Sequence, residues 1–312
     1  MESSISKDIA ERFSSDKNTR SGLLARSWYV FRRWPIFPII VLSVLLFAGI
    51  FAPVLAPHDP ILGNLRLRNA PPAIVDPGWY DERPEATRLL LGGDHVGRDV
   101  LSRVIHGARI SILVAAVSLG TGMLIGTALG LVAGYYGGHV DEIILRTVDV
   151  WHAVPFLLFA MVASVMFGSS FGLVLVLLAT LAWSGFVRNI RAEVLSLREL
   201  DFISASKISG ASDYRILVKH LFPSIRNTLL VISSLRVGQL ILAEASLSFL
   251  GVGIPSPTPA WGLMIAEGRQ YVELAWWQTV VPGIAIFLIV VSLNFLGDWI
   301  RDRLDPRLKQ IL

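Results

Sequence analysis

Three polar residues within one apolar stretch of the sequence have the types and spacing to do chemistry. Arg236, Gln239 and Glu244 fall between about residues 228 and 250, where most side chains are hydrophobic. A charged side chain at the centre of a bilayer costs about 2.5–3.5 kcal/mol even on the lenient insertion scale, so such residues need a reason. On one helix Arg236 and Glu244 are about 12 Å apart along the axis and about 80° apart around it, so they do not pair directly. Two interpretations are open: a polar lining for a solute path, and hydrogen bonding between helices.

A second group of such residues precedes the apolar stretch that begins near residue 110. Asp94, His95 and Asp99 have side chains that ligate metals, but nothing in the sequence fixes the further ligands that a metal site needs. We therefore predict no metal site here, and instead a loop followed by an interfacial helix from about Asp99 to His106. Arg103 on that helix is expected to extend toward lipid headgroups. The sequence has no cysteine, which excludes disulfides, thiolate metal sites and cysteine nucleophiles.

The elements that position these residues are membrane spans. Of 312 residues, 53% are hydrophobic and only 17% are charged, a composition that favours the bilayer as solvent. Six apolar stretches each approach the ~20 residues that cross a ~30 Å hydrocarbon core, which predicts an all-α membrane protein with six transmembrane helices. The tail before the first stretch is long for a signal peptide, so we interpret that stretch as an uncleaved anchor. The predicted spans lie at about residues 36–55, 110–134, 148–167, 171–187, 228–250 and 280–300.

Positive charges set the orientation of these spans. Lys and Arg gather in the tail at 1–35, in the loop at 188–227 and in the terminus at 301–312. Six spans put all three segments on one side, which the positive-inside rule makes cytoplasmic. The segment at 56–107, called the external segment below, then lies outside, and 108–300 forms a five-span core. Because the net charge is only +4 and its basic residues flank apolar spans, we predict membrane topology and no nucleic-acid partner.

The second predicted span carries four glycines at a period of four. In lipid, small residues let helix backbones approach closely, and this contact drives much of helix association. We predict close packing within the subunit in preference to a helix that slides beside a path. The glycines are Gly122, Gly126, Gly130 and Gly134.

The segment from Asp201 to Pro223, called the hook below, has the pattern of two short helices broken at Gly210. Ser212 is a good N-cap residue, and Asp213 suits the positive end of the helix that follows. Pro223 is expected to end that helix. The residues alone leave two interpretations open, a hook held by another protein and an amphipathic loop on the lipid surface. The apolar stripe of the second helix is Tyr214, Leu217, Val218 and Leu221.

The hook resembles the coupling loop of ATP-binding-cassette (ABC) importer permeases. That pattern is Glu-Ala-Ala, three residues, Gly, nine residues, then Ile-x-Leu-Pro. Ser204-Ala205-Ser206 stands in place of Glu-Ala-Ala, Gly210 and Pro223 are in register, and His220-Leu221-Phe222 replaces Ile-x-Leu. By this resemblance, the residues that couple the chain to an ATPase are Ser204, Ala205, Ser206, Gly210, Ala211, Asp213, Arg215, His220 and Pro223.

Further motifs, in order along the chain, resemble the second (C-type) permease of dipeptide, oligopeptide and nickel importers. This resemblance covers about Trp34 to Lys309. It implies a type I ABC importer permease fold with both termini cytoplasmic in the inner (plasma) membrane of a prokaryote. The motifs are Gly93-Asp94-x-x-Gly97-Arg98-Asp99, Ala245-Ser246-Leu247-Ser248-Phe249-Leu250-Gly251 and Asp298-Trp299-x-Arg301-Asp302-x-Leu304-Asp305-Pro306-Arg307.

The resemblance also implies partners and cargo. We expect a second homologous permease, two cytoplasmic ABC ATPases and an external solute-binding protein. The sequence contains neither Gly-x-x-x-x-Gly-Lys-Ser/Thr nor a Gly-x-Gly-x-x-Gly after a soluble strand, so we predict no enzyme activity and no cofactor in this chain, with ATP and Mg on the partner ATPases. The implied cargo is a dipeptide, oligopeptide, glutathione-like peptide, nickel chelate or opine. The competing class, a secondary transporter working alone, would need paired intramembrane carboxylates, whereas Glu244 is the one carboxylate well inside a predicted span.

Overall fold

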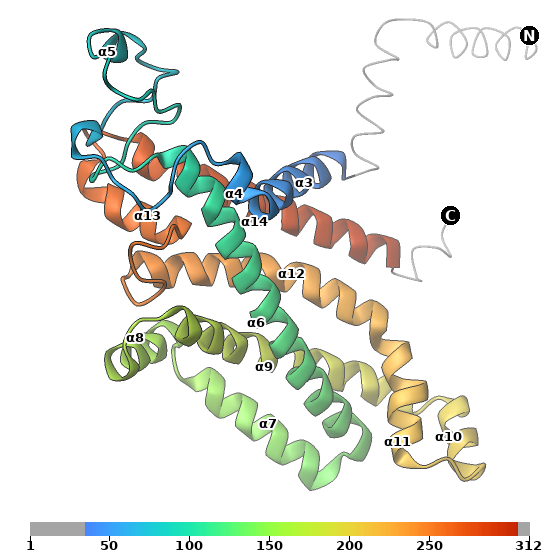
Figure 1. The fold of residues 1–312 in the computed structure, drawn as a ribbon. Coiled ribbons are helices and arrows are strands. Elements are labelled where there is room, and N and C mark those ends of the chain that lie inside the picture. Colours follow the sequence, from blue (N-terminus) through green and yellow to red (C-terminus); the bar gives the residue numbers. More distant parts are fainter. Residues whose placement is uncertain (1–34, 305–312) are drawn as a thin grey trace, which may run out of the picture.

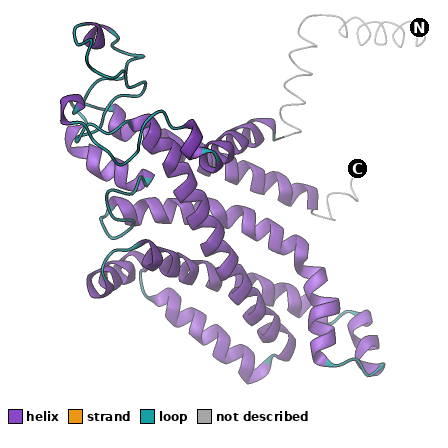
Figure 2. Cartoon of the chain, viewed as in Figure 1, coloured by secondary structure: helices purple, strands orange, loops and turns teal. Residues whose placement is uncertain are grey.

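The computed structural model describes residues 35–304, and apart from one isolated β-bridge its regular structure there is helical (Figure 2). The predictions for the tails at 1–34 and 305–312 lie outside the described residues. The described part begins with α3 (Ile36–Ile50), α4 (Ala52–Leu55), η1 (Leu65–Leu67) and α5 (Gly78–Asp81), and two further short elements, α13 (Trp261–Gly268) and η3 (Arg269–Tyr271), precede the last helix. The remaining elements are α6 (Val100–Tyr136), α7 (Gly138–Ala153), α8 (Phe156–Phe167), α9 (Phe171–Arg198), α10 (Asp201–Ile208), α11 (Asp213–Ile216), η2 (Leu217–Leu221), α12 (Phe222–Phe249) and α14 (Trp277–Leu304).

Four helical segments are long and apolar enough to cross a membrane. They are Val100–Tyr136, Phe171–Arg198, Asp213–Phe249 and Trp277–Arg303, and they confirm the second, fourth, fifth and sixth predicted spans. Each segment extends beyond its apolar stretch, because backbone hydrogen bonding continues where side chains become polar. The interfacial helix predicted for Asp99–His106 is therefore wrong as a separate element, since those residues form the start of α6.

The third predicted span, 148–167, is not a single straight helix. α7 and α8 form a pair bent by 80° at the break between Ala153 and Phe156. Pro155 explains the break, because the residue before a proline is disfavoured in the helical conformation. Val154 is accordingly extended, at φ −92° and ψ 122°.

The first predicted span, 36–55, is only partly helical. α3 has 15 residues, which gives a length of about 22 Å, less than the ~30 Å hydrocarbon core. The helix ends at Ile50, with Phe51 as its C-cap, and four further residues that include Pro53 form α4. The described residues thus hold four membrane-crossing helices, or five if the bent pair counts as one span. The six-span prediction is confirmed only to this extent.

The glycine stripe lies where α6 packs against α9, the most extensive helix pair in the described chain. A Cβ added at Gly126 would lie 2.3 Å from the carbonyl oxygen of Trp183, and one at Gly122 would lie 2.4 Å from the Cβ of Ala182. Gly130 and Gly134 approach Ile190 and Val194 of α9 in the same way. The stripe therefore lets two backbones touch, which confirms the prediction of close packing within the subunit.

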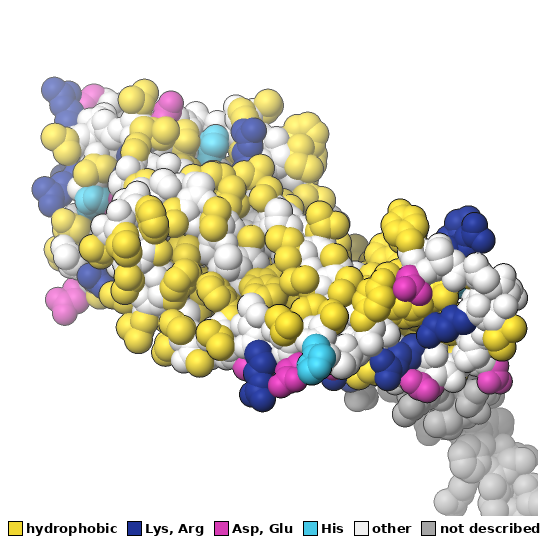
Figure 3. All heavy atoms as spheres, turned by 90° about the horizontal axis from the view of Figure 1, so that it is seen from below, with side chains coloured by type: hydrophobic (Ala, Val, Ile, Leu, Met, Phe, Trp, Pro, Cys, Tyr) yellow, Lys and Arg dark blue, Asp and Glu magenta, His cyan; other side chains and the backbone are white. Residues whose placement is uncertain are grey.

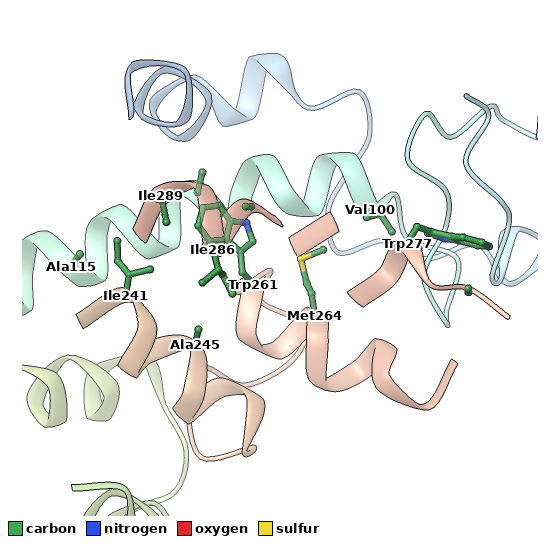
Figure 4. Packing of buried hydrophobic residues seen from close by; sticks show 12 residues of the cluster. Val100, Ala115, Ile241, Ala245, Trp261, Met264, Trp277, Ile286 and Ile289 are labelled. Carbon is green, nitrogen blue, oxygen red and sulfur yellow. The ribbon is translucent and has the colours of Figure 1, made fainter. Parts of the chain in front are cut away.

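Helix α13 is wedged between α6, α12 and α14 at the external end (Figure 4). Trp261 at its start is fully buried and donates from Nε1 to the carbonyl oxygen of Val104 at 3.0 Å. Gly107 makes room for that ring, because a Cβ there would lie 2.5 Å from the indole. Met264, one turn along, packs in the same cluster as Ile286 of α14. The short helix is thus anchored in the apolar core.

Four charged side chains join the external segment to α13. Arg98 pairs with Asp94 at 2.5 Å and with Glu267 at 2.8 Å. Arg103 pairs with the same Glu267 at 3.1 Å and is fully buried. The prediction that Arg103 extends toward lipid headgroups is therefore wrong, because its charge is neutralised inside the protein. We call these four residues the external ion cluster.

The external ion cluster also accounts for the metal-ligating residue types noted in the sequence. Ligand atoms of Asp94, His95 and Glu267 lie within 4.8 Å of one another. Two arginines already neutralise both carboxylates of this group, which disfavours a divalent cation there. Asp99 is not in the group and caps α6, where its carboxylate accepts from the backbone N–H of Leu101 and Ser102.

The external segment has a small core of its own around Tyr80. The Tyr80 hydroxyl donates to the carbonyl oxygen of Pro71 at 2.7 Å, and burial raises the pKa of this hydroxyl. This segment and the hook lie at opposite ends of the molecule (Figure 1). Seen from below in Figure 3, many hydrophobic side chains lie on the surface, and the charged side chains gather toward its edges.

Candidate coupling loop and intramembrane polar residues

The hook turns at Gly210 by a helix C-cap of the Schellman type. The backbone N–H of Gly210 donates to the Lys207 carbonyl, and that of Ala211 donates to the Ser206 carbonyl, each at 3.0 Å. This pattern needs a left-handed residue after the C-cap, a conformation that glycine adopts without steric cost. Gly210 has φ +77°, as the motif requires. The two short helices predicted around this glycine are confirmed as α10 and α11.

The second helix of the hook begins as the sequence predicts and is tied to the end of α6. Ser212 is its N-cap, and the side-chain oxygen accepts from the backbone N–H of Arg215 at 3.4 Å. The Tyr135 hydroxyl of α6 donates to the Asp213 carboxylate at 2.7 Å. The Lys207 ammonium lies 5.0 Å from the centre of the Tyr135 ring. Tyr135 therefore contacts both short helices and fixes their positions relative to α6.

One side of the hook is buried and the other is open. Ile203, Ile216 and Leu221 are fully buried in a cluster that includes residues of α9. On the open side, Ile208 is 88% exposed and Tyr214 is 76% exposed. Large apolar side chains this exposed on an anchored element are typical of a surface that another protein covers.

The predicted coupling residues lie mostly on this open side. Ser204, Ala205, Gly210, Asp213, Arg215 and Pro223 are exposed, while Ser206, Ala211 and His220 are partly buried. Ser206 donates to the carbonyl oxygen of Phe202 at 2.8 Å, and the His220 ring lies 6.4 Å from the Phe202 ring. The structure thus brings all nine residues onto one helix–turn–helix element.

Pro223 does not end a helix, contrary to the prediction. It lies in the first turn of α12, directly after the π-helical turn η2, and the helix runs on to Phe249. The proline is accommodated because the π-helical turn directly before it already departs from the regular hydrogen-bond pattern of the α-helix. The helical segment Asp213–Phe249 therefore links the hook directly to the membrane.

Arg236 and Gln239 lie together on α12. The Arg236 Nη1 donates to the Gln239 Oε1 at 3.1 Å. Gln239 is exposed and Arg236 is partly buried. The space beside the guanidinium comes from Gly185 on α9, because a Cβ at that position would lie 1.9 Å from Nη2. These two polar residues therefore lie on an exposed face of α12 next to α9. We call this face the open side of the subunit, which is distinct from the exposed side of the hook.

Glu244 lies apart from this pair, inside the protein. It is 1% exposed, and its Oε1 accepts from the Ser248 hydroxyl at 2.7 Å. The Ser248 oxygen in turn accepts from the backbone N–H of Ile254 at 3.2 Å. Among the three polar residues considered for a solute path, Glu244 is thus the buried one. Through Ser248 it is hydrogen-bonded to the loop after α12.

Three further charged or titratable residues lie near Arg236. In the sequence, His152 is one turn from Asp149, a spacing that allows a metal pair but for which we predict a helix-end hydrogen bond, and Arg188 is assigned no role. Arg188 on α9 donates to the Asp149 carboxylate on α7 at 2.8 Å, and both side chains are about half exposed. His152, also exposed on α7, lies within electrostatic range of Arg188, Arg236 and Asp149. In the sequence these charges mark the ends of two apolar stretches, and Arg188 falls just after the predicted fourth span. In the structure α9 continues to Arg198, so Arg188 lies on that helix.

Comparison with known proteins identifies the family. The model of the family described as "Binding-protein-dependent transport system inner membrane component" matches residues 126–310, more than half of the chain. That range contains the hook, the glycines from Gly126 onward, and α12 with Arg236 and Gln239.

Curated relatives match over most of the chain. The di/tripeptide transport system permease protein DppC of Pseudomonas aeruginosa is 36% identical over 97% of this chain and 92% of its own length. The dipeptide transport system permease protein DppC of Haemophilus influenzae is 35% identical over 92% of this chain and 96% of its own length. The glutathione transport system permease protein GsiD of Pectobacterium atrosepticum is 42% identical over 70% of this chain and 73% of its own length.

A solved structure shares the fold. A chain of the MetNI methionine ABC transporter, in inward-facing conformation, matches with a TM-score of 0.52 and 20% identity over 66% of this chain and 97% of that one. The hook, the membrane helices and these similarities agree with one another. This multi-pass permease belongs to the family of binding-protein-dependent transport system inner membrane components.

Proposed function

We propose that this chain is one of two homologous permease subunits of an importer driven by two cytoplasmic ABC ATPases, which bind the ATP and Mg. The observation that carries the proposal is the hook, which is anchored on one side and exposes Ile208 and Tyr214 on the other. A solute-binding protein outside the cell delivers the cargo, in keeping with the family's description. Each ATPase binds the hook at residues from Ser204 to Pro223.

The same proposal includes the full type I architecture with six spans and both termini in the cytoplasm. α3 is then the first span, although it has only 15 residues. It packs against α6 and α14, and most of its large apolar side chains are exposed, as expected for a helix in contact with lipid. The bent pair α7–α8 is the third span.

The hook is built to transmit movement. Its Schellman turn and the contacts of Tyr135 hold the two short helices as one unit. The segment Asp213–Phe249 continues from the hook through the membrane without a break. When ATP draws the two ATPases together, the hooks move with them, and the spans exchange between inward-open and outward-open states.

The proposed cargo is a peptide or a peptide-like solute. The names of similar proteins support this class, since they include dipeptide, di/tripeptide and glutathione permeases. Arg236 and Gln239, on the open side of α12, are proposed to line the path of that solute.

The test is reconstitution in proteoliposomes. The purified chain alone is expected to hydrolyse no ATP above background. Assembled with its partner permease and two ATPases, it is expected to take up a dipeptide such as dialanine, with hydrolysis stimulated by the binding protein. Uptake by this chain alone, driven by an ion gradient, would contradict the proposal and support a secondary transporter.

A further inference from the structure

Arg236 is a positive charge near the middle of a membrane helix, and no acidic side chain of residues 35–304 forms an ion pair with it. It lies 14 residues from Phe222 and 13 from Phe249, the two ends of α12. None of the ion pairs formed within residues 35–304 includes Arg236. Its hydrogen bond there goes to the neutral Gln239 amide. The other guanidinium N–H groups are therefore ready for an acceptor that comes from outside the chain.

The neighbouring helix is shaped to hold this guanidinium in place. A Cβ at Gly185 would lie 1.9 Å from Nη2, 2.5 Å from Cζ and 3.0 Å from Nε of Arg236. The guanidinium thus lies directly against the backbone of α9, in space that only a glycine leaves free. Position 185 is buried, so the close approach is part of the packing between α9 and α12.

A few other polar groups lie on the helices next to Arg236. Arg188 is three residues from Gly185 on α9 and therefore lies on the same helix face. It pairs with Asp149 of α7, and His152 lies within electrostatic range of Arg188 and Arg236. Two arginines and one aspartate leave one positive charge in excess when His152 is neutral. Polar groups from α7, α9 and α12 thus lie near one another, with an excess of positive charge.

We propose that Arg236, oriented by Gly185 and assisted by Gln239, binds a carboxylate of the transported solute, namely the C-terminal carboxylate of a peptide. The planar fork of a guanidinium matches a carboxylate better than any other side chain does. Partial burial excludes some water and strengthens the contact, while the open side lets the solute leave. This inference rests on the proposed function, and it assigns the chemical group of the cargo that the subunit contacts.

The first test uses the intact complex with its binding protein in proteoliposomes. Arg236→Gln is expected to lower dialanine uptake at least tenfold, whereas the complex stays assembled. Gly185→Ala keeps the charge but displaces the flexible end of Arg236, and it is expected to lower uptake as well. Arg236→Lys keeps the charge without the fork and is expected to fall between wild type and Arg236→Gln. Arg301→Gln, an exposed arginine at the end of α14, serves as the matched control and is expected to transport normally.

The second test identifies the bound group and does not involve the binding protein. Saturation-transfer NMR is measured on the complex in nanodiscs with millimolar dialanine or dialanine amide. Dialanine is expected to give a signal that is lost in Arg236→Gln, and the amide is expected to give a weak signal in both proteins. Equal signals for acid and amide in wild type would overturn the assignment of the carboxylate.

The outcomes separate this inference from the proposed function. Normal uptake by Arg236→Gln in a complex whose wild type imports dialanine overturns the carboxylate site and leaves the function standing. Dissociation of Arg236→Gln from the partner permease also overturns it, because Arg236 would then pair with a carboxylate of that subunit. If wild type imports no peptide at all, the proposed function itself fails.

Discussion

Arg98 and Glu267 are 169 positions apart in the sequence, yet the Arg98 Nη2 and the Glu267 Oε2 are 2.8 Å apart. The contact joins the external segment to α13, and buried Arg103 binds the same carboxylate. Glu267 also accepts from the Ser256 hydroxyl at 3.0 Å, which adds the loop before α13. One carboxylate therefore connects three parts of the external end.

Removing the charge of Glu267 is expected to destabilise this end of the protein. In Glu267→Gln, two buried arginines would share Asp94 alone, and breaking a buried ion pair on one side costs about 3–5 kcal/mol. We expect a lower thermal unfolding temperature of the detergent-solubilised complex, measured by tryptophan fluorescence. Glu273→Gln, at an exposed position nearby, is the control and should unfold like wild type. Equal unfolding temperatures for both variants would show that the external ion cluster contributes no stability.

The packing of α6 on α9 predicts different effects for two glycines of the same helix. Gly126→Ala would place a Cβ 2.3 Å from the backbone oxygen of Trp183, whereas a Cβ at Gly120 would meet no atom within 4 Å. Backbone atoms cannot yield as a side chain does, so overpacking at Gly126 is expected to cost about 1–3 kcal/mol. Complex recovered by size-exclusion chromatography after mild heating should fall for Gly126→Ala and stay normal for Gly120→Ala. The reverse order would refute the close packing described here.

At position 210 of the hook, the backbone conformation restricts which side chains fit, whereas the surrounding space does not. A Cβ at Gly210 would meet nothing within 4 Å, but φ is +77°. A β-branched side chain in this conformation costs about 1–2 kcal/mol or more, while Asn tolerates it better. We expect Gly210→Val to insert normally into the membrane but to lose ATPase co-purification and uptake. Gly210→Asn should retain most of both, and equal loss in the two variants would point to a steric role instead.

A second variant tests the exposed surface of the hook without altering its backbone. Ala205 is exposed on α10, so Ala205→Glu is expected to leave the fold unchanged. If the ATPases cover this surface, the added charge should weaken their binding and reduce uptake. Wild-type transport by both Gly210→Val and Ala205→Glu would show that the hook is not the coupling element.

The absence of native cysteine makes the topology directly measurable. We expect Cys at Glu85, exposed in the external segment, to react in spheroplasts with a membrane-impermeant thiol reagent. Cys at Ile208, 88% exposed on the hook, should react only after permeabilisation. Labelling of Ile208→Cys in intact spheroplasts would put the hook on the wrong side for a cytoplasmic ATPase.

The hook shows how far local sequence rules reach. The N-cap at Ser212 and the left-handed turn at Gly210 involve neighbours within a few residues, so residue types alone predicted them. Pro223 satisfies the same local rules for a helix end and for a first helical turn. In the structure the π-helical turn before Pro223 and the packing of Leu221 let the helix continue through this residue. A local sequence pattern does not distinguish this outcome from a helix end.

The sequence by itself determined the membrane class, four of the spans, the two short helices of the hook and the small-residue stripe, because hydropathy, capping and residue size act over short distances. Only the tertiary structure decided the partners of the charged residues. Arg103 and Glu267, or Arg236 and Gly185, meet through packing between elements far apart in the chain. Glu244 and Arg236 lie on one helix, and the sequence made both of them candidates for a solute path. Neighbouring elements bury Glu244, whereas Arg236 stays partly exposed on the open side of the subunit.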